Sequence, residues 1–271
     1  MVVSDSHLSA AAPEGLTNWE AVAAHVGRTR PALVVHLGDV TLDGARHPDE
    51  LGPARELLDR LPVAWRAVPG NHDVGDNPWP GCDAAETVNA ERLRGWADAF
   101  GPDRFVVELG GWTVIGLNTQ LFASGLAEEA DQWAWLEGHL ERSAGRPTLL
   151  CTHKPLRGPA DEQAAAPPYR FVPPEAAARL GEILGAARVA ARLSGHVHQF
   201  RRLELDGQLS VWAPTSWAVL PDRIQPVLGA KQVGVLSVLL DDDATATVEF
   251  TEPPGIAQLT IGEQIADPYG P

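Results

Sequence analysis

The chain has 271 residues, of which 44% are hydrophobic, and its 36 acidic and 21 basic side chains give a formal net charge of −15 at pH 7. Such an acidic chain repels nucleic-acid backbones, so no nucleic-acid polymer is expected as a partner. No stretch approaches the ~20 apolar residues that span a bilayer, and no basic segment followed by an apolar run opens the chain, so neither a membrane nor a signal peptide is expected. Cys82 and Cys151 form no C-x-x-C pair, which predicts a reduced, cytoplasmic protein without a disulfide framework.

Predicted strands and helices alternate over the first two-thirds of the chain. Thr17-Asn18-Trp19-Glu20 has the form of a capping box and predicts a helix start, and Gly110-Gly111 predicts a hairpin turn. In chain order the pattern predicts strand 1–4, helix 17–28, strand 32–37, helix 48–61, strand 63–68, helix 87–100, paired strands 104–109 and 112–118, helix 128–143, strand 148–152, helix 173–187 and strand 189–194.

Hairpins replace this alternation in the last third. Strands 203–205 and 208–212 flank Asp206-Gly207, a strong turn signal, and strands 233–240 and 245–251 flank three aspartates that we interpret as a solvated turn. Residues 252–271 are rich in proline and glycine and are expected to wrap the surface. The pattern predicts a single α/β domain over 1–271, with two sheets packed face to face and helices outside.

Five polar blocks each follow a predicted strand, namely Asp5-Ser6-His7, Gly38-Asp39, Gly70-Asn71-His72-Asp73, Thr152-His153-Lys154-Pro155 and Gly195-His196-Val197-His198. Side chains at the carboxyl ends of strands can converge on one edge of a sheet. In an extended segment, residues two apart face the same way, so we expect Asp5 and His7 to point together, and His196 and His198 likewise. The glycines at 38, 70 and 195 would allow sharp turns beside a crowded site.

The donor types in these blocks indicate a metal. Imidazole, carboxylate and amide groups suit Mn, Fe, Zn or Co rather than Ca²⁺, which prefers oxygen alone. No cysteine lies in the blocks, so a thiolate zinc site is not supported.

The order D-x-H, GD, GNHD, H, GHxH resembles the calcineurin-like metallophosphoesterases, and is most similar to their class III cyclic-nucleotide phosphodiesterase group. The resemblance implies a four-layer αββα sandwich of two mixed β-sheets flanked by helices. It also implies two metal ions that share Asp39 as a bridge. The first would be held by Asp5, His7, Asp39 and His198, and the second by Asp39, Asn71, His153 and His196. His72 would contact the phosphate and protonate the leaving group, and Asp73 would orient His72.

Two departures from relatives bear on the metals and the substrate. Purple acid phosphatases carry a tyrosine three residues after the bridging aspartate, where this chain has Leu42. A ferric–tyrosinate site is therefore not expected, and Mn, Fe with Mn, or Zn is favoured. Lys154 stands where relatives often have a second histidine.

Such a site is expected to hydrolyse phosphoesters. Two divalent ions, the carboxylates of Asp5 and Asp39 and a bridging hydroxide sum to roughly +1, so an anionic phosphate is attracted despite the acidic chain. The hydroxide would attack in line with the leaving alkoxide, and a histidine beside the site is a natural proton donor near neutral pH.

Other residues near the blocks are candidates for substrate contacts. Trp79, Tyr169 and Phe171 would stack on a base or leaving group, and Arg157 and Arg170 would clamp a second phosphate. Four histidines lie outside the blocks and are interpreted as structural or surface residues, namely His25, His36, His47 and His139.

Three functions remain open at this point. The leading one is a phosphodiesterase acting on a small nucleotide-like or cyclic-nucleotide substrate, and the second is a phosphomonoesterase acting on a small metabolite phosphate. The loops at 74–100, 155–175 and 214–230 would separate these two. The third is a non-catalytic scaffold, as some members of the fold are, including a retromer subunit. Oligomeric state is not fixed by the sequence.

Overall fold

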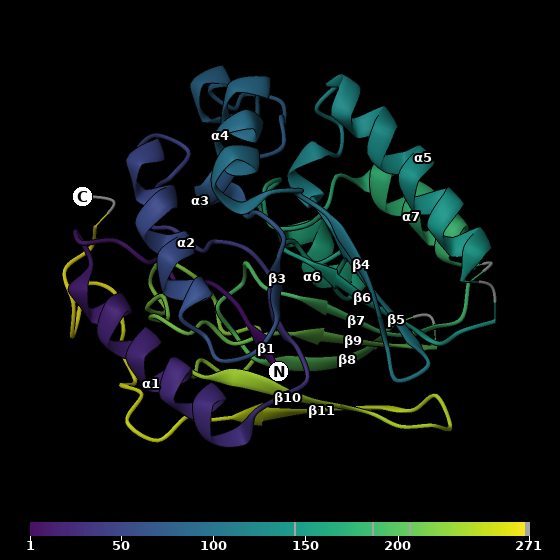
Figure 1. Ribbon diagram of the computed structural model, residues 1–271. Coiled ribbons are helices and arrows are strands. Elements are labelled where there is room, and N and C mark those ends of the chain that lie inside the picture. Colours follow the sequence, from purple (N-terminus) through teal and green to yellow (C-terminus); the bar gives the residue numbers. More distant parts are fainter. Residues whose placement is uncertain (144, 186, 206, 269–271) are drawn as a thin grey trace.

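The structure is a computed structural model that describes residues 1–143, 145–185, 187–205 and 207–268, and in it two β-sheets pack face to face with helices outside (Figure 1). The first sheet has the order β11–β10–β1–β2–β3, built from β1 (Val2–Val3), β2 (Val34–His36), β3 (Trp65–Ala67), β10 (Val235–Leu240) and β11 (Ala246–Thr251). The second has the order β4–β5–β6–β7–β9–β8, built from β4 (Phe105–Leu109), β5 (Trp112–Leu117), β6 (Thr148–Thr152), β7 (Val189–Ser194), β8 (Arg201–Leu205) and β9 (Gln208–Trp212).

Both sheets are mixed. Strands β1, β2 and β3 run parallel, as do β5, β6, β7 and β9, while β10, β11, β4 and β8 pair antiparallel with their neighbours. The helices are α1 (Pro13–Thr29), α2 (Leu51–Asp59), α3 (Asn71–Val74), α4 (Ala90–Phe100), α5 (Ala127–Arg142), α6 (Ala160–Ala165) and α7 (Pro174–Gly185). No helix in the described part of the chain has the length and apolar character that crossing a bilayer requires.

Three apolar interfaces separate four layers. In the first, Trp19 of α1, Leu58 of α2 and Trp96 of α4 pack with residues of the first sheet such as Val34. In the second, the inner faces of the two sheets meet. In the third, Trp133, Leu136, Leu180 and Leu184 of α5 and α7 pack on the outer face of the second sheet. The fold is therefore the expected αββα sandwich, in which each sheet buries both faces.

The start of α1 differs from the capping-box prediction. The helix begins at Pro13, whose fixed φ and missing N–H suit a first helical position. Thr17 lies one turn inside the helix, where its hydroxyl donates to the Pro13 carbonyl oxygen at 3.2 Å. The side chain of Asn89 caps α4, so that helix begins at Ala90 rather than at 87.

Most other predicted elements are confirmed. The boundaries of β6, β7 and β9 agree with the predictions, while the predicted helix over 48–61 is a 3₁₀ turn followed by α2. The short helices α3 and α6 were not predicted. Residue 186 of the predicted helix 173–187, Asp206 of the predicted turn and residues 269–271 of the tail lie outside the described residues.

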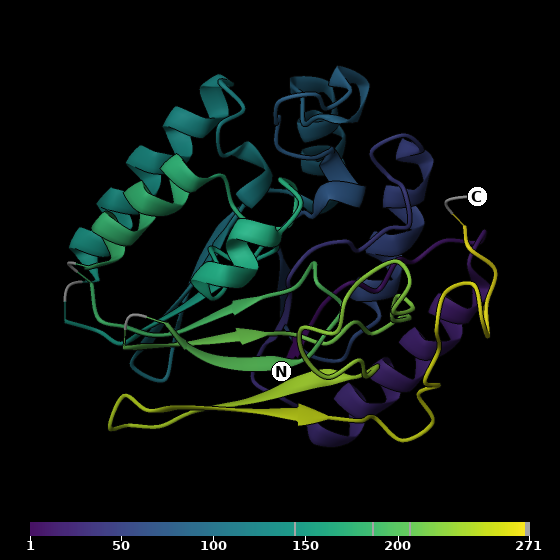
Figure 2. The ribbon, with the colours of Figure 1, turned by 180° about the vertical axis from the view of Figure 1, so that it is seen from behind.

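Asn18 ties the tail to α1. Its side chain is fully buried, and its amide nitrogen donates to the carbonyl oxygens of Trp217 (2.9 Å) and Ala257 (3.0 Å). Its amide oxygen accepts from the Ala257 N–H at 2.8 Å. The tail therefore runs along α1, as the yellow segment beside the purple helix in Figure 2 shows. Further along the tail, Thr260 forms an isolated β-bridge with Val219.

We expect Asn18→Ala to lower the free energy of unfolding by about 2–4 kcal/mol, because it removes three hydrogen bonds, each worth about 0.5–1.5 kcal/mol. Urea denaturation measures the change. Thr17→Ala is the matched control, and since Thr17 is exposed inside the helix its loss should cost less than about 0.5 kcal/mol. A larger loss for Thr17→Ala than for Asn18→Ala would restore the capping-box interpretation.

Candidate metal centre

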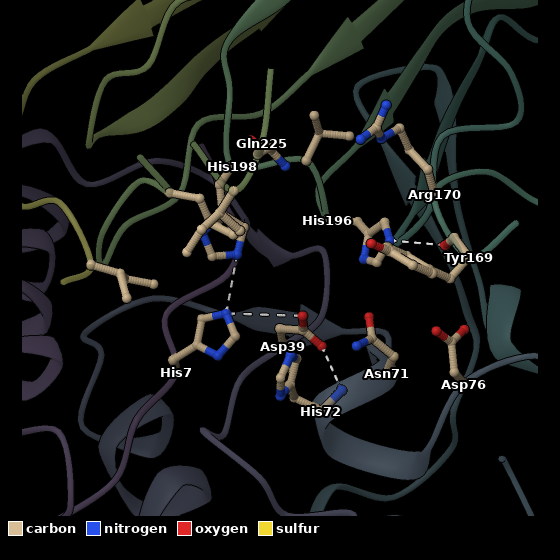
Figure 3. Close-up of a pocket in the computed structure, with 14 residues that line it drawn as sticks. His7, Asp39, Asn71, His72, Asp76, Tyr169, Arg170, His196, His198 and Gln225 are labelled. Atoms are coloured by element: carbon tan, nitrogen blue, oxygen red, sulfur yellow. Dashed lines mark hydrogen bonds and ion pairs between the residues drawn. The ribbon is translucent and has the colours of Figure 1, made fainter. Parts of the chain in front are cut away.

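All five polar blocks meet at one edge of the sandwich. They follow β1, β2, β3, β6 and β7, whose carboxyl ends lie at the same edge because these strands are parallel within each sheet. Figure 3 shows His7, Asp39, Asn71, His196 and His198 around one cavity. The structure thus brings together side chains as distant in the chain as Asp5 and His198.

The backbone at the site is left-handed rather than extended. Five of the eight non-glycine residues with positive φ in the described chain are predicted ligands, namely Asp5 (51°), His7 (45°), Asp39 (51°), His196 (68°) and His198 (57°). Asp5 and His7 converge as expected, whereas His196 and His198 belong to separate ligand clusters, and the expected basis in extended geometry is wrong. Left-handed backbone is unfavourable for such residues, and clusters of this kind are typical of functional sites.

Two glycines are required by close approach at this edge. A Cβ on Gly38, whose φ is 99°, would lie 2.7 Å from the backbone nitrogen of Gly70 and 2.8 Å from Nδ1 of His153. A Cβ on Gly70 would overlap the Asp39 carboxylate. The predicted steric role of these glycines is confirmed, because a larger side chain would displace the residues that gather around Asp39.

The first cluster contains Asp5, His7, Asp39 and His198, each buried and each with a ligand atom within 4.8 Å of the others. Nε2 of His7 lies 3.2 Å from Nε2 of His198 and 3.9 Å from a carboxylate oxygen of Asp39. Nε2 of His198 lies 3.4 Å from Oδ1 of Asp5. Donor atoms of two imidazoles and two carboxylates therefore face a common point.

The second cluster contains Asp39, His153 and His196, again within 4.8 Å. Nε2 of His153 lies 3.3 Å from Oδ2 of Asp39 and 3.1 Å from Oδ1 of Asn71. Asp39 belongs to both clusters, which is the arrangement of a bridging carboxylate.

Backbone carbonyls fix the tautomers of two ligand candidates. Nδ1 of His153 lies 2.9 Å from the Leu37 oxygen, and Nδ1 of His198 lies 2.8 Å from the Ala218 oxygen. A carbonyl oxygen only accepts, so each Nδ1 carries a proton and each Nε2 is the nitrogen that can bind a metal. Partners of this kind orient histidines that bind metals.

His196 is held in the opposite sense. Its Nε2 donates to the Tyr169 carbonyl oxygen at 3.0 Å, drawn as a dashed line in Figure 3, which leaves Nδ1 as the ligand atom. Its backbone N–H donates to both carboxylate oxygens of Asp5 at 3.1 Å. His196 therefore couples the first cluster to the loop that carries Tyr169.

Burial and charge set the ionisation of the cluster. Burial and the neighbouring His72 hold the pKa of His7 well below its usual range, and burial and His153 do the same for the pKa of His196. Burial also opposes charge on His153, but Asp39 outweighs it and raises the pKa of His153 to about 9. A cation that binds His153 must displace this proton, so metal uptake is coupled to proton release.

These observations fit two divalent ions. The donor set combines imidazole nitrogens with carboxylate and amide oxygens, the ligand types of Mn, Fe and Zn sites. Imidazole nitrogens and carboxylate oxygens lie 3.2–3.9 Å from one another in the two clusters. Because backbone carbonyls also orient several of the imidazoles, the clusters form ligand shells suited to cations.

His72 lies beside both clusters. Its backbone N–H donates to Oδ1 of Asp39 at 2.9 Å, its ring centroid lies 4.9 Å from that of His7, and its side chain lines the cavity. His72 lies on α3, the one-turn helix that begins at Asn71 shortly after the end of β3.

Asp73 is buried and links two of the loops. Its carboxylate accepts from the backbone N–H groups of Val40 (3.1 Å), Thr41 (2.9 Å) and Gly70 (2.9 Å), and from the Thr41 hydroxyl at 2.7 Å. Burial and the nearby Asp39 raise the pKa of Asp73 to about 6. These bonds position the loop that carries Asp39, and an effect of Asp73 on His72 stays a prediction.

The cavity over the clusters holds about 200 Å³ and draws on all three loops expected to contact substrate. Asp76 comes from the first, Tyr169 and Arg170 from the second, and Leu220, Ile224 and Gln225 from the third. The tail adds Ile261, which no sequence signal indicated.

The other predicted substrate residues lie further out. Trp79 packs on Tyr169, with 5.8 Å between ring centroids, and so supports a wall of the cavity. Phe171 is buried next to Trp212. Arg157 lines a different cavity.

Lys154 forms a buried ion pair that the sequence did not indicate. Its side chain is fully buried, and its amine contacts Oδ1 of Asp76. Burial lowers the pKa of Lys154, and the Asp76 carboxylate opposes that shift. The residue at the position of the second histidine in relatives therefore neutralises a carboxylate at the cavity wall.

The family model for the calcineurin-like phosphoesterase matches residues 1–200. The chain therefore belongs to the calcineurin-like phosphoesterase family and is a metal-dependent phosphoesterase, with a His/Asp cluster that indicates a dinuclear divalent metal centre. No curated protein sequence matches the chain significantly.

Solved structures share the fold at low sequence identity. A dimetal phosphatase from Danio rerio has a TM-score of 0.59 at 15% identity, over 91% of this chain and 96% of that one. GAP50, the anchor in the inner membrane complex of Plasmodium, has 0.63 at 13% identity, over 98% and 90%. The purple acid phosphatase PPD1 from yellow lupin (Lupinus luteus) seeds has 0.63 at 14% identity, over 95% of this chain and 52% of that one.

The number of bound metal ions should distinguish Asp39, which belongs to both clusters, from His7, which belongs to one. We expect about two divalent ions per chain in the wild type, almost none in Asp39→Asn and about one in His7→Ala, because Asp39 serves both clusters. Inductively coupled plasma mass spectrometry measures the ions. His47→Ala, which changes an exposed histidine, should retain both. Two ions in Asp39→Asn would contradict a bridging role.

Proposed function

We propose that this phosphoesterase is a phosphodiesterase for small nucleotide-like substrates, with cyclic nucleotides as the first candidates. The observation that carries the proposal is a cavity with two separate walls. Tyr169 and Arg170 stand beside His196, while Leu220 follows Ala218, the residue that binds His198. A phosphodiester has two ester groups, and each wall would receive one. The order of the polar blocks, which resembles the class III phosphodiesterases, supports the same choice.

The ligand shells would hold the ions. Asp5, His7, Asp39 and His198 would bind one, and Asp39, Asn71, His153 and His196 the other. When bound, two divalent ions activate a water molecule as the nucleophile and neutralise charge on the phosphoryl oxygens. We infer Mn, Fe with Mn, or Zn, since the position three residues after Asp39 is a buried leucine, Leu42, and offers no phenolate.

His72 would act as the general acid. Its side chain lines the cavity, and the hydrogen bond from its backbone N–H to Asp39 holds the start of α3 against the two clusters. From there the imidazolium would protonate the departing ester oxygen. Arg170 would pair with anionic oxygens of the substrate, and the ring of Tyr169, backed by Trp79, would stack on a base.

The dimensions of the cavity support a small substrate. About 200 Å³ accommodates a phosphoryl group and part of its ester groups but not a polymer, and the net charge of −15 opposes nucleic-acid binding. Both cysteines are free thiols, which supports a reducing, cytoplasmic location.

We expect metal-depleted protein reloaded with Mn²⁺ to hydrolyse bis-p-nitrophenyl phosphate with a higher kcat/KM than p-nitrophenyl phosphate. Release of p-nitrophenolate is followed by absorbance, with Asp39→Asn as the inactive control. The 3′,5′-cyclic nucleotides are tested next, by chromatography of the products. A preference for the monoester would make the protein a phosphatase for small metabolite phosphates. No turnover on either ester, with metal bound, would favour a scaffold.

Removal of the general acid should depend on the leaving group. His72→Ala is expected to lower kcat by roughly 10²–10⁴-fold for a diester that loses an alkoxide, because that oxygen needs a proton. The loss should be much smaller for a p-nitrophenyl diester, whose leaving group is stable as an anion. Equal losses for both esters would indicate that His72 binds phosphate without donating a proton, and His47→Ala should change neither.

A further inference from the structure

A second cavity of about 550 Å³ lies between α7 and strands β7 and β9. β7 and β9 are paired neighbours in the second sheet, and α7 packs on the outer face of that sheet. The cavity shares none of its described lining residues with the one over the metal clusters. Its size is that of a site for a small ligand, and Leu156 and Ala177 give it apolar walls.

Arg192 of β7 is the central polar group of this cavity. Its side chain is buried, with 8% of the residue exposed, and its Nε has no hydrogen-bond partner among the described residues. No ion pair joins it to a described carboxylate. A buried N–H group without a partner is costly, because it has lost its hydrogen bond to water and gained none within the protein. Such a group in a native structure calls for a ligand.

The surroundings of Arg192 increase this cost. Arg157 lines the same cavity, and its positive charge adds to burial in lowering the pKa of Arg192. Guanidinium groups nevertheless stay protonated in proteins. Glu182 is the one carboxylate among the described lining residues, and it is exposed at the rim. Arg157 is likewise exposed, so Arg192 is the buried charge among the described lining residues, and it is positive in a chain of net charge −15.

A second unpartnered atom distinguishes between possible anions. Oε1 of Gln208, at the start of β9, is buried and has no hydrogen-bond partner among the described residues. It lines the cavity together with Arg192. A ligand that satisfies both atoms must accept from Arg192 and donate to Gln208. A hydrogenphosphate group does both, whereas an ionised carboxylate only accepts.

We propose that this cavity is a second phosphate-binding site, in which Arg192 and Arg157 hold the phosphate group and Oε1 of Gln208 accepts a hydrogen bond from its P–OH group. The apolar walls leave room for a small organic body, so a free phosphate ion and a phosphorylated metabolite share the recognition chemistry. The site does not depend on which ester the metal centre hydrolyses.

Isothermal titration calorimetry of the Mn²⁺-loaded protein tests the proposal. With inorganic phosphate we expect one site that Arg192→Met weakens by on the order of 10-fold or more, in addition to any binding at the metals. Arg60→Met removes the same charge from an exposed side chain and should leave binding unchanged. Hydrolysis of bis-p-nitrophenyl phosphate should be unchanged in Arg192→Met, since Arg192 does not line the metal cavity.

A second variant provides for misfolding of the first, and a second ligand distinguishes a phosphorylated metabolite from free phosphate. Gln208→Leu should weaken phosphate binding while leaving the fold intact, because Gln208 lies at a strand end, so it replaces Arg192→Met if that variant fails to fold. AMP that binds more tightly than inorganic phosphate at this site would identify a phosphorylated metabolite, and the reverse order would identify the free ion. Identical phosphate binding in wild type and both variants, or tighter binding of citrate than of phosphate, would overturn the proposal.

Discussion

The structure is organised around the buried carboxylate of Asp39. A carboxylate in the interior is stable only when charge or hydrogen bonds compensate for lost water. Here His153 and His72 outweigh burial and hold the pKa of Asp39 well below its usual range, and the N–H of His72 donates to Oδ1. Because the same group belongs to both clusters, the loops that follow β2, β3 and β6 must all end within a few ångströms of it.

That requirement explains the unusual backbone at this edge. Side chains from neighbouring strands reach one point only if the chain turns sharply after each strand, which left-handed backbone at Asp5, Asp39 and His196 provides. The strain is maintained because the strands themselves are fixed between three apolar interfaces. The carboxylate of Asp73 adds a local tie, binding the loop after β2 to Gly70. Rigid layers thus support a strained, polar edge.

The orientation of the candidate metal ligands is physically linked to the walls of the cavity. The Tyr169 carbonyl fixes His196 while the side chain of the same residue lines the cavity, and the Ala218 carbonyl fixes His198 two residues before Leu220 enters the wall. Movement of either wall would therefore disturb a ligand. The ion pair of Lys154 with Asp76 neutralises a carboxylate that lines the same cavity.

The sequence by itself determined the candidate ligand types, their order and the strands that carry them, because these depend on local patterns such as the apolar runs 148–152 and 189–194 followed by histidines. It also determined the layered fold, since alternating elements bury both faces of two sheets in few ways. The tertiary structure decided which groups support the site. The histidines are oriented by the backbone carbonyls of Leu37, Ala218 and Tyr169, and every residue type has such a carbonyl, so the sequence does not reveal them. The entry of Ile261 into the cavity depends on contacts between the tail and α1. Arg157, in the loop after β6, and Arg192 of β7 line a second cavity together, and such long-range proximity is not encoded in any local window.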